Sequence, residues 1–377
     1  MDKVLVLMST YNGEKYLKTQ IDSLLAQEGV EVEILVRDDG SKDRTLEILD
    51  EYKNAYTKAF IEGGHDEDLH VSYSDAKNAV YGSDEIDTEA LAEGIQKRSK
   101  ASFDYYIGEN LGPAGSFLDL MKHAPEADFY ALCDQDDTWL PDKLKIAVDA
   151  IKQGIRRSRQ DYELSLGKKS ISGGSIDGGK LQNHSTEDIP VLYYGMPRFS
   201  DNDGNLLKGA KGIYEKSLDF SSCLIKSNST GCTMVFNRTL LELINSKTPG
   251  SITMHDEWLH KVCLAMGGML LYDEDVHILY RQHGGNTIGG QLSTKKILKR
   301  YIETLTKPDC IRSRCIRSLV ECYGKDMPEN NLEMAEKVAS YKDSLENRMK
   351  LFLDNDIKME YHKRNIMFKL AVLLGIF

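Results

Sequence analysis

The stretch Phe129-Tyr-Ala-Leu-Cys-Asp-Gln-Asp-Asp-Thr-Trp-Leu-Pro-Asp-Lys-Leu144 decides which fold we expect. It opens with an apolar run, which is the pattern of a strand buried on both faces of a sheet. Three aspartates follow within four positions, Asp134, Asp136 and Asp137. Pro141 stands where a helix would begin, and apolar residues recur beyond it at helical spacing. We therefore predict a buried strand, an acidic turn and a helix in direct succession.

The three neighbouring aspartates repel one another, so a fold keeps them together only at a cost. A hard divalent cation relieves that repulsion, and Mg²⁺ in particular binds one or two carboxylates together with substrate phosphate oxygens. A solvated acidic turn is the alternative for an isolated Asp-x-Asp. The buried strand before the motif and the helix after it favour a metal-binding site.

The composition of the chain narrows its class. With 377 residues, 41% hydrophobic and 28% charged, it is long enough for two domains or for one large α/β domain with an appendage. The net charge of -11 argues against a general nucleic-acid partner. The seven cysteines form no metal-type Cys-x-x-Cys pair, no leader pattern precedes Lys3, and no apolar run reaches about 18 residues. We expect reduced thiols and a cytoplasmic protein.

The first hundred residues alternate between apolar strand patterns and amphipathic helix patterns. Val4–Met8 reads as a buried strand that ends in Ser9-Thr-Tyr-Asn-Gly13, and a helical pattern follows. Val32–Val36 repeats the arrangement and ends in Arg37-Asp-Asp-Gly-Ser41. Strands and helices in this order predict a doubly wound, mostly parallel sheet flanked by helices.

The polar clusters all follow strands, and ligands of such sheets bind beyond the carboxyl ends of the strands. We therefore predict a single site built from Ser9–Gly13, Asp38–Ser41 and Asp134–Asp137. The chain lacks the Gly-x-Gly-x-x-Gly and Walker patterns, so the usual glycine-rich phosphate loops are absent. Carboxylates in their place suggest phosphates that are held through a metal.

Other segments are expected to surround this site. An acidic insertion occupies about residues 61–102, and a flexible Gly/Ser/Lys loop about residues 167–180. Thr230–Phe236 reads as a returning strand. From residue 291 to 377 the pattern is helical, with a locally basic start and an apolar end. These last helices either lie on a membrane surface, form a contact between subunits, or pack back onto the first domain.

Two further motifs carry candidate chemistry. Met254-His-Asp-Glu-Trp-Leu-His260 places Asp256 at a partly apolar helix start, where its pKa could rise towards that of a working base. A plain helix N-cap is the alternative. Arg281-Gln-His-Gly-Gly-Asn286 could serve a diphosphate, with Arg281 as a fork donor and His283 as a metal ligand, or it could be a loop with a surface histidine.

The motifs together resemble family 2 glycosyltransferases of the GT-A fold, over about residues 1–290. They are, in order, Ser9-Thr-Tyr-Asn-Gly13, Asp38-Asp-Gly-Ser41, Asn110-Leu-Gly112, Asp134-Gln-Asp-Asp-Thr-Trp139, His255-Asp256 and Tyr280-Arg-Gln-His283. The Cys-Asp-Gln-Asp-Asp-x-Trp form and the Tyr-Arg-Gln-His-Gly ending look most like bacterial rhamnosyltransferases that build cell-wall or capsular polysaccharide.

The resemblance implies inverting transfer of a sugar, L-rhamnose from dTDP-L-rhamnose, onto a lipid-linked or growing polysaccharide acceptor, with Mg²⁺ or Mn²⁺ as the cofactor. It implies donor-binding roles for a set of residues at the strand ends: Thr10, Tyr11, Asn12, Gly13, Asp38, Asp39, Asn110, Asp134, Arg281 and His283. The metal would be bound by Asp134, Asp136 and His283. Asp256 would be the base that deprotonates the acceptor hydroxyl.

Two positions depart from the family pattern. Glu257 stands where many members have an aromatic residue, so either Asp256 or Glu257 could be the base. Arg37 precedes the Asp38-Asp39 pair where a small residue is usual, and the sequence gives no reason for it.

Other readings stay open at this point. A family 2 enzyme could instead use a UDP-hexose or a UDP-N-acetylhexosamine, because no spacing reveals the shape of a sugar pocket. A sugar nucleotidyltransferase is a more distant alternative, since such enzymes need a glycine-rich phosphate loop that Ser9–Gly13 does not provide. The chain could act as a homo-oligomer or bind peripherally to the inner face of the plasma membrane.

Overall fold

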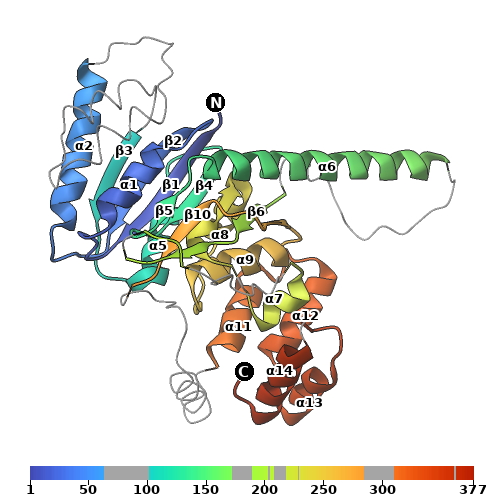
Figure 1. Cartoon of the computed structure of the whole chain (residues 1–377). Coiled ribbons are helices and arrows are strands. Elements are labelled where there is room, and N and C mark those ends of the chain that lie inside the picture. The colour runs from blue at the N-terminus through green and yellow to red at the C-terminus, as the bar shows by residue number, and fades with distance from the viewer. Residues whose placement is uncertain are drawn as a thin grey trace.

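The computed structural model describes residues 1–62, 102–171, 189–202, 204–207, 218–227, 229–283, 310–360 and 362–377. This part of the chain is built on a seven-stranded sheet with the strand order β3-β2-β1-β4-β8-β6-β9 (Figure 1). Across the sheet the strands are β3 (Ser102–Ile107), β2 (Glu31–Asp38), β1 (Lys3–Thr10), β4 (Phe129–Cys133), β8 (Val235–Asn237), β6 (Val191–Gly195) and β9 (Met269–Asp273). Only β8 runs antiparallel to its neighbours. The predicted mostly parallel α/β sheet is confirmed.

Helices cover both faces of this sheet because the central strands carry apolar side chains on both faces. In β1, Val4, Val6 and Met8 face one hydrophobic cluster, whereas Leu5 and Leu7 face the other. The first cluster is closed by α1 (Leu17–Leu25), α2 (Thr45–Glu62) and α6 (Lys143–Ile171). The second is closed by α5 (Gly112–Lys122), α8 (Arg238–Ser246) and α9 (His255–Ala265). The sheet is thus buried on both sides, and its strand ends are the natural place for polar groups.

A second, three-stranded sheet lies beside the carboxyl end of β4. Its order is β5 (Thr138–Trp139), β10 (Ile278–Arg281) and β7 (Arg198–Ser200), with β10 antiparallel to β5 and parallel to β7. Because β5 follows β4 after only four residues, the acidic turn joins the two sheets. This small sheet brings the end of β10 next to that turn.

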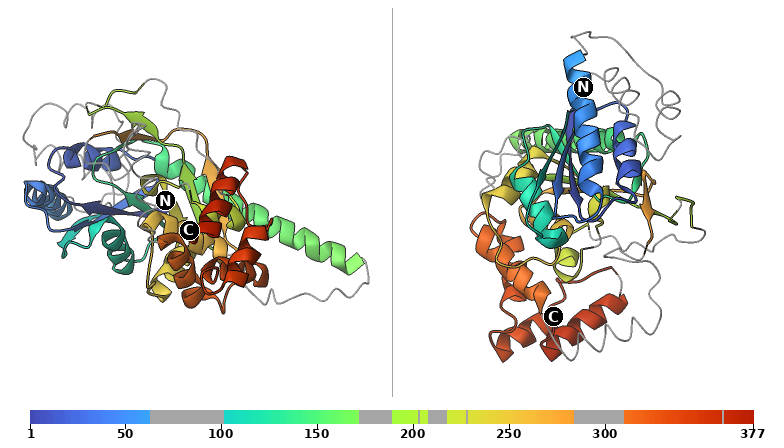
Figure 2. Two further views of the ribbon diagram at one scale, coloured as in Figure 1. Left: turned by 90° about the horizontal axis from the view of Figure 1, so that it is seen from below. Right: turned by 90° about the vertical axis from the view of Figure 1, so that its left-hand side faces the viewer.

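The helical C-terminal extension is also confirmed. It consists of α11 (Ile311–Tyr323), α12 (Glu329–Ala339), α13 (Leu345–Leu353) and α14 (His362–Leu374), and α12 contacts the short helix α7 (Phe220–Ile225). Its apolar side chains belong to the same core as α9, where the Trp258 and Tyr323 rings lie 6.2 Å apart. The extension lies at the end of the molecule away from α2 (Figure 2). Among the described helices, none has both the length and the apolar character needed to cross a bilayer.

The segment Thr230–Phe236 differs from the predicted strand. Gly231–Thr233 forms a 3₁₀ turn, η1, and only Val235–Asn237 is extended. The Thr233 amide donates to the carbonyl of Thr230 at 3.0 Å, and the Thr233 hydroxyl donates to the same oxygen at 2.7 Å. The apolar pattern therefore predicted the burial of this segment correctly, but the predicted strand is wrong for Gly231–Thr233. Burial alone does not distinguish a strand from a buried turn.

Several expected segments lie partly or wholly outside the described residues. Of the acidic insertion, only its ends are described, and these belong to α2 and β3. Residues 167–171, expected to begin a flexible loop, are the last turns of α6, and residues 172–180 lie outside the described residues. The same holds for Gly284–Asn286 and for the basic stretch between residues 293 and 309. The strand β6, which was not predicted from the sequence, begins shortly after the undescribed residues 172–188.

Candidate active site

The polar clusters predicted to share one site do meet at one edge of the sheet. Thr10 at the end of β1 pairs in register with Asp38 at the end of β2, and Met8 pairs with Cys133, just before Asp134. The three clusters are therefore neighbours across β2, β1 and β4, as parallel strands require. Their side chains, however, have different tasks.

Asp38 is a structural carboxylate. It is fully buried, and it accepts hydrogen bonds from the Thr10 hydroxyl at 3.0 Å, the Gly40 amide at 3.0 Å, and the amide and hydroxyl of Ser41 at 2.8 and 2.5 Å. These four donors occupy its oxygens. Asp38 thus fixes the turn after β2 to the end of β1, and its carboxylate faces inward.

Asp39 is also held from within the protein, and Arg37 explains how. The amides of Leu111 and Gly112, at the start of α5, each donate to Asp39 at 2.9 Å. The Arg37 guanidinium forms an ion pair with Asp39 and donates to Asp119 of α5 at 2.8 Å. Arg37 and Asp39 are 2% and 3% exposed. A carboxylate at a helix N-terminus is favourable, and the buried guanidinium balances its charge.

The loop after β1 is rigid in its backbone, and it leaves one aromatic ring open. The Asn12 amide donates to the Ser41 hydroxyl and the Gly13 amide to the Thr45 hydroxyl, both at 2.8 Å. The Gln135 side chain bonds the amide and carbonyl of Tyr11, at 2.8 and 3.0 Å. A Cβ on Gly13 would lie 2.3 Å from Gln135 Oε1, so a side chain there would displace Gln135 from its bonds to Tyr11. Tyr11 itself remains 48% exposed.

The acidic turn divides its carboxylates between two neighbours. Asp136 Oδ2 lies 2.6 Å from His283 Nε2. Asp137 accepts the backbone amide of Arg281 at 3.0 Å. Asp134 and Asp137 form a group with the Cys232 thiol of η1, in which one ligand atom from each residue lies within 4.8 Å of the others. Of the predicted metal set, Asp136 and His283 are in contact, whereas Asp134 groups with Asp137 and Cys232.

The crowding of carboxylates has an electrostatic signature. Burial, with the neighbouring charge of Asp136, raises the pKa of Asp137 to about 7. Burial, with the charges of Asp137 and Asp136, raises the pKa of Asp134 well above its usual range. Both shifts mean that the ionised cluster is destabilised when only protein surrounds it.

The residues of this cluster fit a divalent cation of the hard or borderline type. Carboxylate oxygens and an imidazole nitrogen are the ligands that Mg²⁺ and Mn²⁺ accept, and a cation would offset the repulsion that raises the carboxyl pKa values. Cys232 is not suited to the role, because burial, with the nearby carboxylates, raises the pKa of its thiol well above the ordinary value. Asp136 and His283, which are partly accessible, are better placed to bind an ion than the inner group.

Arg281 and Tyr16 hold the outer side of the cluster. The Arg281 guanidinium donates to the carbonyls of Asp136 at 2.9 Å and Asn202 at 2.6 Å, and lies over the Tyr16 ring at 4.8 Å from its centroid. The same ring packs against that of His283, with centroids 5.1 Å apart. Arg281 therefore positions the acidic turn, and Tyr16, which the sequence analysis did not select, orients His283.

Asp256 lies on the other side of η1, in the first turn of α9. The helix N-cap is Met254, so the expectation of a plain N-cap at Asp256 is wrong. The carboxylate accepts the Gly231 amide at 3.2 Å and the Glu257 amide at 2.7 Å. Burial raises its pKa to about 6. Since Cys232 touches the acidic cluster and Gly231 touches Asp256, one short turn links the two.

Glu257 has a different environment from its neighbour. It accepts the Thr253 hydroxyl at 2.6 Å and the buried Lys261 ammonium at 3.0 Å. Burial raises the pKa of Glu257, but Lys261 and Thr253 outweigh this effect and leave the pKa below its ordinary value. A carboxylate held in this way is a weak base, which favours Asp256 of the two candidates.

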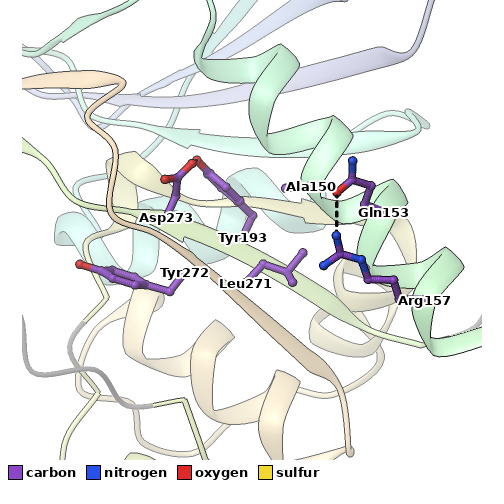
Figure 3. Close-up of a pocket in the computed structure, with 8 residues that line it drawn as sticks. Ala150, Gln153, Arg157, Tyr193, Leu271, Tyr272 and Asp273 are labelled. Carbon is purple, nitrogen blue, oxygen red and sulfur yellow. Dashed lines mark hydrogen bonds between the residues drawn. The ribbon is translucent and has the colours of Figure 1, made fainter. Parts of the chain in front are cut away.

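A small pocket lies at the far edge of the sheet, apart from this cluster. It has a volume of about 190 Å³ and lies between α6 and the edge strand β9 (Figure 3). Arg157, which donates to Gln153 at 3.4 Å, and Tyr193, which donates to Asp273 at 2.8 Å, lie at its walls. None of the predicted site residues lines it.

Comparison with known proteins identifies the family. The family described as "Glycosyl transferase family 2" matches residues 5–71, which include β1, β2 and their polar ends. The dTDP-rhamnosyl transferase RfbG of Shigella flexneri is 24% identical over 299 residues, 78% of this chain and 77% of that protein. The chain belongs to glycosyltransferase family 2.

With two further relatives, the similarity extends over a smaller share of the relative's own length. An uncharacterized glycosyltransferase of Nostoc sp. is 39% identical over 289 residues, 75% of this chain and 66% of that protein. The poly(ribitol-phosphate) beta-N-acetylglucosaminyltransferase TarS of Staphylococcus aureus is 32% identical over 121 residues, 32% of this chain and 19% of that protein. The crystal structure of TarS 1–349 with UDP-GlcNAc aligns at a TM-score of 0.44 and 14% identity, covering 100% of this chain and 93% of that chain.

Within this family 2 glycosyltransferase, the Arg37–Asp39 pair generates a first prediction. Arg37→Met leaves Asp39 buried without its counterion, and we expect the free energy of unfolding to fall by about 3–5 kcal/mol. Asp39→Asn alone should also destabilise the protein, but Arg37→Met with Asp39→Asn should cost at least about 1 kcal/mol less than the sum of the two. Urea unfolding of the four proteins measures this coupling, and additive costs would show that the pair does not act as a unit.

A second prediction concerns the pH dependence of stability. The native pKa of Asp256, about 6, exceeds the ordinary 3.8, so the native state binds the proton more tightly and this group's contribution falls as pH rises from about 4 to 6. Asp256→Asn should remove that decline. Glu257→Gln should have the opposite pH dependence. The lowered pKa of Glu257 means that its ionised form stabilises the fold at neutral pH, so the stability lost in Glu257→Gln should become smaller as the pH falls.

Urea unfolding of the metal-free protein and both variants between pH 4 and 8 tests this second prediction. At pH 7.5 Glu257→Gln should lose about 2–4 kcal/mol, because Lys261 then stays buried without its partner. If the stability of Asp256→Asn relative to the parent does not change between pH 4 and 7, the raised pKa is refuted.

Proposed function

We propose that the chain is an inverting, metal-dependent glycosyltransferase that moves a sugar from a nucleotide-sugar to a hydroxyl of a lipid-linked or growing cell-wall or capsular polysaccharide. One observation carries the proposal. Asp136 with His283, and Asp134 with Asp137 and Cys232, lie at the end of β4, and η1 carries both Cys232 and the Gly231 amide that bonds the buried Asp256 carboxylate. A donor diphosphate at Asp136 and His283 and an acceptor hydroxyl at Asp256 would place the two reactants side by side.

The donor nucleoside would lie along the ends of β1 and β3. Tyr11 and Asn110 are exposed there, together with Ile107 and Leu111. The Tyr11 ring can stack on a base, and Asn110 can bond the ribose. Thr10, Asn12, Gly13, Asp38 and Asp39 then act by shaping this surface, because their polar groups are already engaged within the protein.

The diphosphate would be held at the acidic cluster. Asp136 and His283 would bind Mg²⁺ or Mn²⁺, with Asp134 facing the sugar or completing the ligand set. A cation held by these residues would supply positive charge that stabilises the leaving diphosphate. Arg281 keeps Asp136 in place through the carbonyl of that residue and adds positive charge beside it.

Asp256 would be the base. Its pKa of about 6 leaves it ionised at neutral pH while making it more basic than an ordinary aspartate. The Gly231 and Glu257 amides fix the direction of the carboxylate. Attack by the deprotonated acceptor on the face opposite to the leaving diphosphate inverts the anomeric centre.

The donor we propose is dTDP-L-rhamnose. The motif forms near Asp134 and His283 support it, and so does the similarity to a dTDP-rhamnosyl transferase that extends over 78% of the chain. A UDP-hexose or UDP-N-acetylhexosamine is the second candidate, supported by 121 residues of similarity to an N-acetylglucosaminyltransferase. A sugar nucleotidyltransferase is disfavoured, since the backbone amides of Asn12 and Gly13 bond hydroxyls of the protein and form no phosphate loop.

Kinetics of site variants test this function. Asp136→Ala should lower kcat/KM with Mn²⁺ by about 10³-fold or more, and weaken binding of the donor only when metal is present. Asp256→Asn should keep donor binding and lower kcat by about 10²–10⁴-fold, whereas Glu257→Gln should stay within about tenfold. The rate of the parent enzyme should fall below about pH 6, where Asp256 is protonated.

The control for loss of a carboxylate is Asp149→Ala, on the exposed side of α6, where Asp149 pairs with Lys145. It should keep full activity. Transfer of radiolabelled sugar from dTDP-L-rhamnose and from a set of UDP-sugars provides the readout. Full activity of Asp136→Ala would remove the metal assignment, and a large loss in Glu257→Gln alone would make Glu257 the base.

A further inference from the structure

The last helix, α14, has two faces of different character. Phe368 and Val372 are buried, and the Phe368 ring packs against Phe377 with centroids 4.8 Å apart. The other side carries five large apolar residues that are each between 40% and 60% exposed: Ile366, Met367, Leu370, Leu373 and Leu374. The helix is therefore anchored to the core on one side and apolar towards solvent on the other.

These exposed residues form one continuous stripe. At about 100° per residue they span about 120° of the helix circumference, which is the width of a face that normally packs against something. Large exposed apolar surfaces of this kind mark contact sites in folded proteins. Within α14 the apolar stripe, named here the outer face, is made of Ile366, Met367, Leu370, Leu373 and Leu374.

Positive charge surrounds the outer face. Residues 362–377 include Lys363, Arg364 and Lys369 and no acidic residue, in a chain whose net charge is -11. On a helical projection Lys369 and Arg364 flank the outer face on its two sides, and Lys363 lies at its amino-terminal end. The Cys310 thiol donates to the Gly375 carbonyl at 3.5 Å, which ties the end of α14 to the start of α11.

An apolar stripe bordered by cations matches the interface of a bilayer with anionic headgroups. The apolar side chains enter the acyl boundary, while the lysine and arginine side chains reach the headgroups. The helix has 13 residues, about 20 Å in length, so it fits in the plane of the surface and is too short to cross it. A second copy of the chain fits less well, because a two-fold contact between outer faces would bring the same cations together.

We propose that the outer face of α14 binds the protein peripherally to anionic lipid membranes. The C-terminal extension carries this face at the end of the molecule away from α2 (Figures 1 and 2). The inference depends on the exposure and charge of α14 alone, and it holds whichever sugar the enzyme transfers.

Co-sedimentation of the full chain with lipid vesicles tests the proposal. Vesicles of phosphatidylcholine with about 30% phosphatidylglycerol should bind the protein at low salt, and pure phosphatidylcholine should bind it weakly. Leu370→Gln with Leu373→Gln should lower the partition coefficient by about tenfold or more. Lys363→Gln with Lys369→Gln should lower binding to the anionic vesicles and make it less sensitive to salt.

The matched control is Leu206→Gln, an exposed leucine in the first domain with similar exposure, which should bind like the parent. Circular dichroism and the midpoint of unfolding should stay close to those of the parent in all variants, since the replaced leucines and Lys363 are exposed and Lys369 loses one surface bond, to Asn355 at 2.9 Å. The proposal is overturned if the parent does not bind anionic vesicles, or if Leu370→Gln with Leu373→Gln leaves binding intact. It is also overturned if the parent is a dimer that this double variant dissociates, because the outer face would then bind a second copy.

Discussion

The repulsion among Asp134, Asp136 and Asp137 at the end of a buried strand is the constraint on which the site depends. Each has a partner elsewhere in the chain: His283 faces Asp136, the Arg281 amide bonds Asp137, and Cys232 lies against Asp134 and Asp137. These partners come from β10 and η1, far along the chain. The small sheet and the buried 3₁₀ turn bring these partners to the acidic turn. A bound cation would offset the repulsion that remains among the carboxylates.

A second buried charge arrangement lies at the ends of β2 and α5, where we propose that the nucleoside binds. Arg37 ties the end of β2 to α5 through Asp39 and Asp119, and so fixes the backbone at Leu111 and Gly112. The rigid loops then present Tyr11 outward. The two arrangements have different roles. The buried ion pairs fix the shape of the strand ends, whereas the partly accessible Asp136 and His283 can bind ligands. This division explains why some family motif residues, such as Asp38, face inward.

The sequence predicted those parts of the fold that depend on local pattern. The apolar runs of β1, β2 and β4 and the helical spacing after Pro141 were sufficient to predict the sheet, and the three polar clusters met as expected. It did not predict η1, because the partners of Cys232 are about a hundred residues away. Nor did it explain Arg37, whose partner Asp119 is distant in sequence. The engagement of Glu257 by Lys261 could have been found, since the two are spaced by four in a predicted helix.

The proposed function depends on whether the acidic cluster binds a nucleotide diphosphate through a divalent cation. Thermal unfolding of the full chain with dTDP, with and without Mn²⁺, measures this most directly, because a ligand of the folded state raises the midpoint with the logarithm of its concentration. We predict that dTDP raises the midpoint with Mn²⁺ present and has little effect in EDTA. An equal shift in EDTA, or no shift under either condition, would contradict the account.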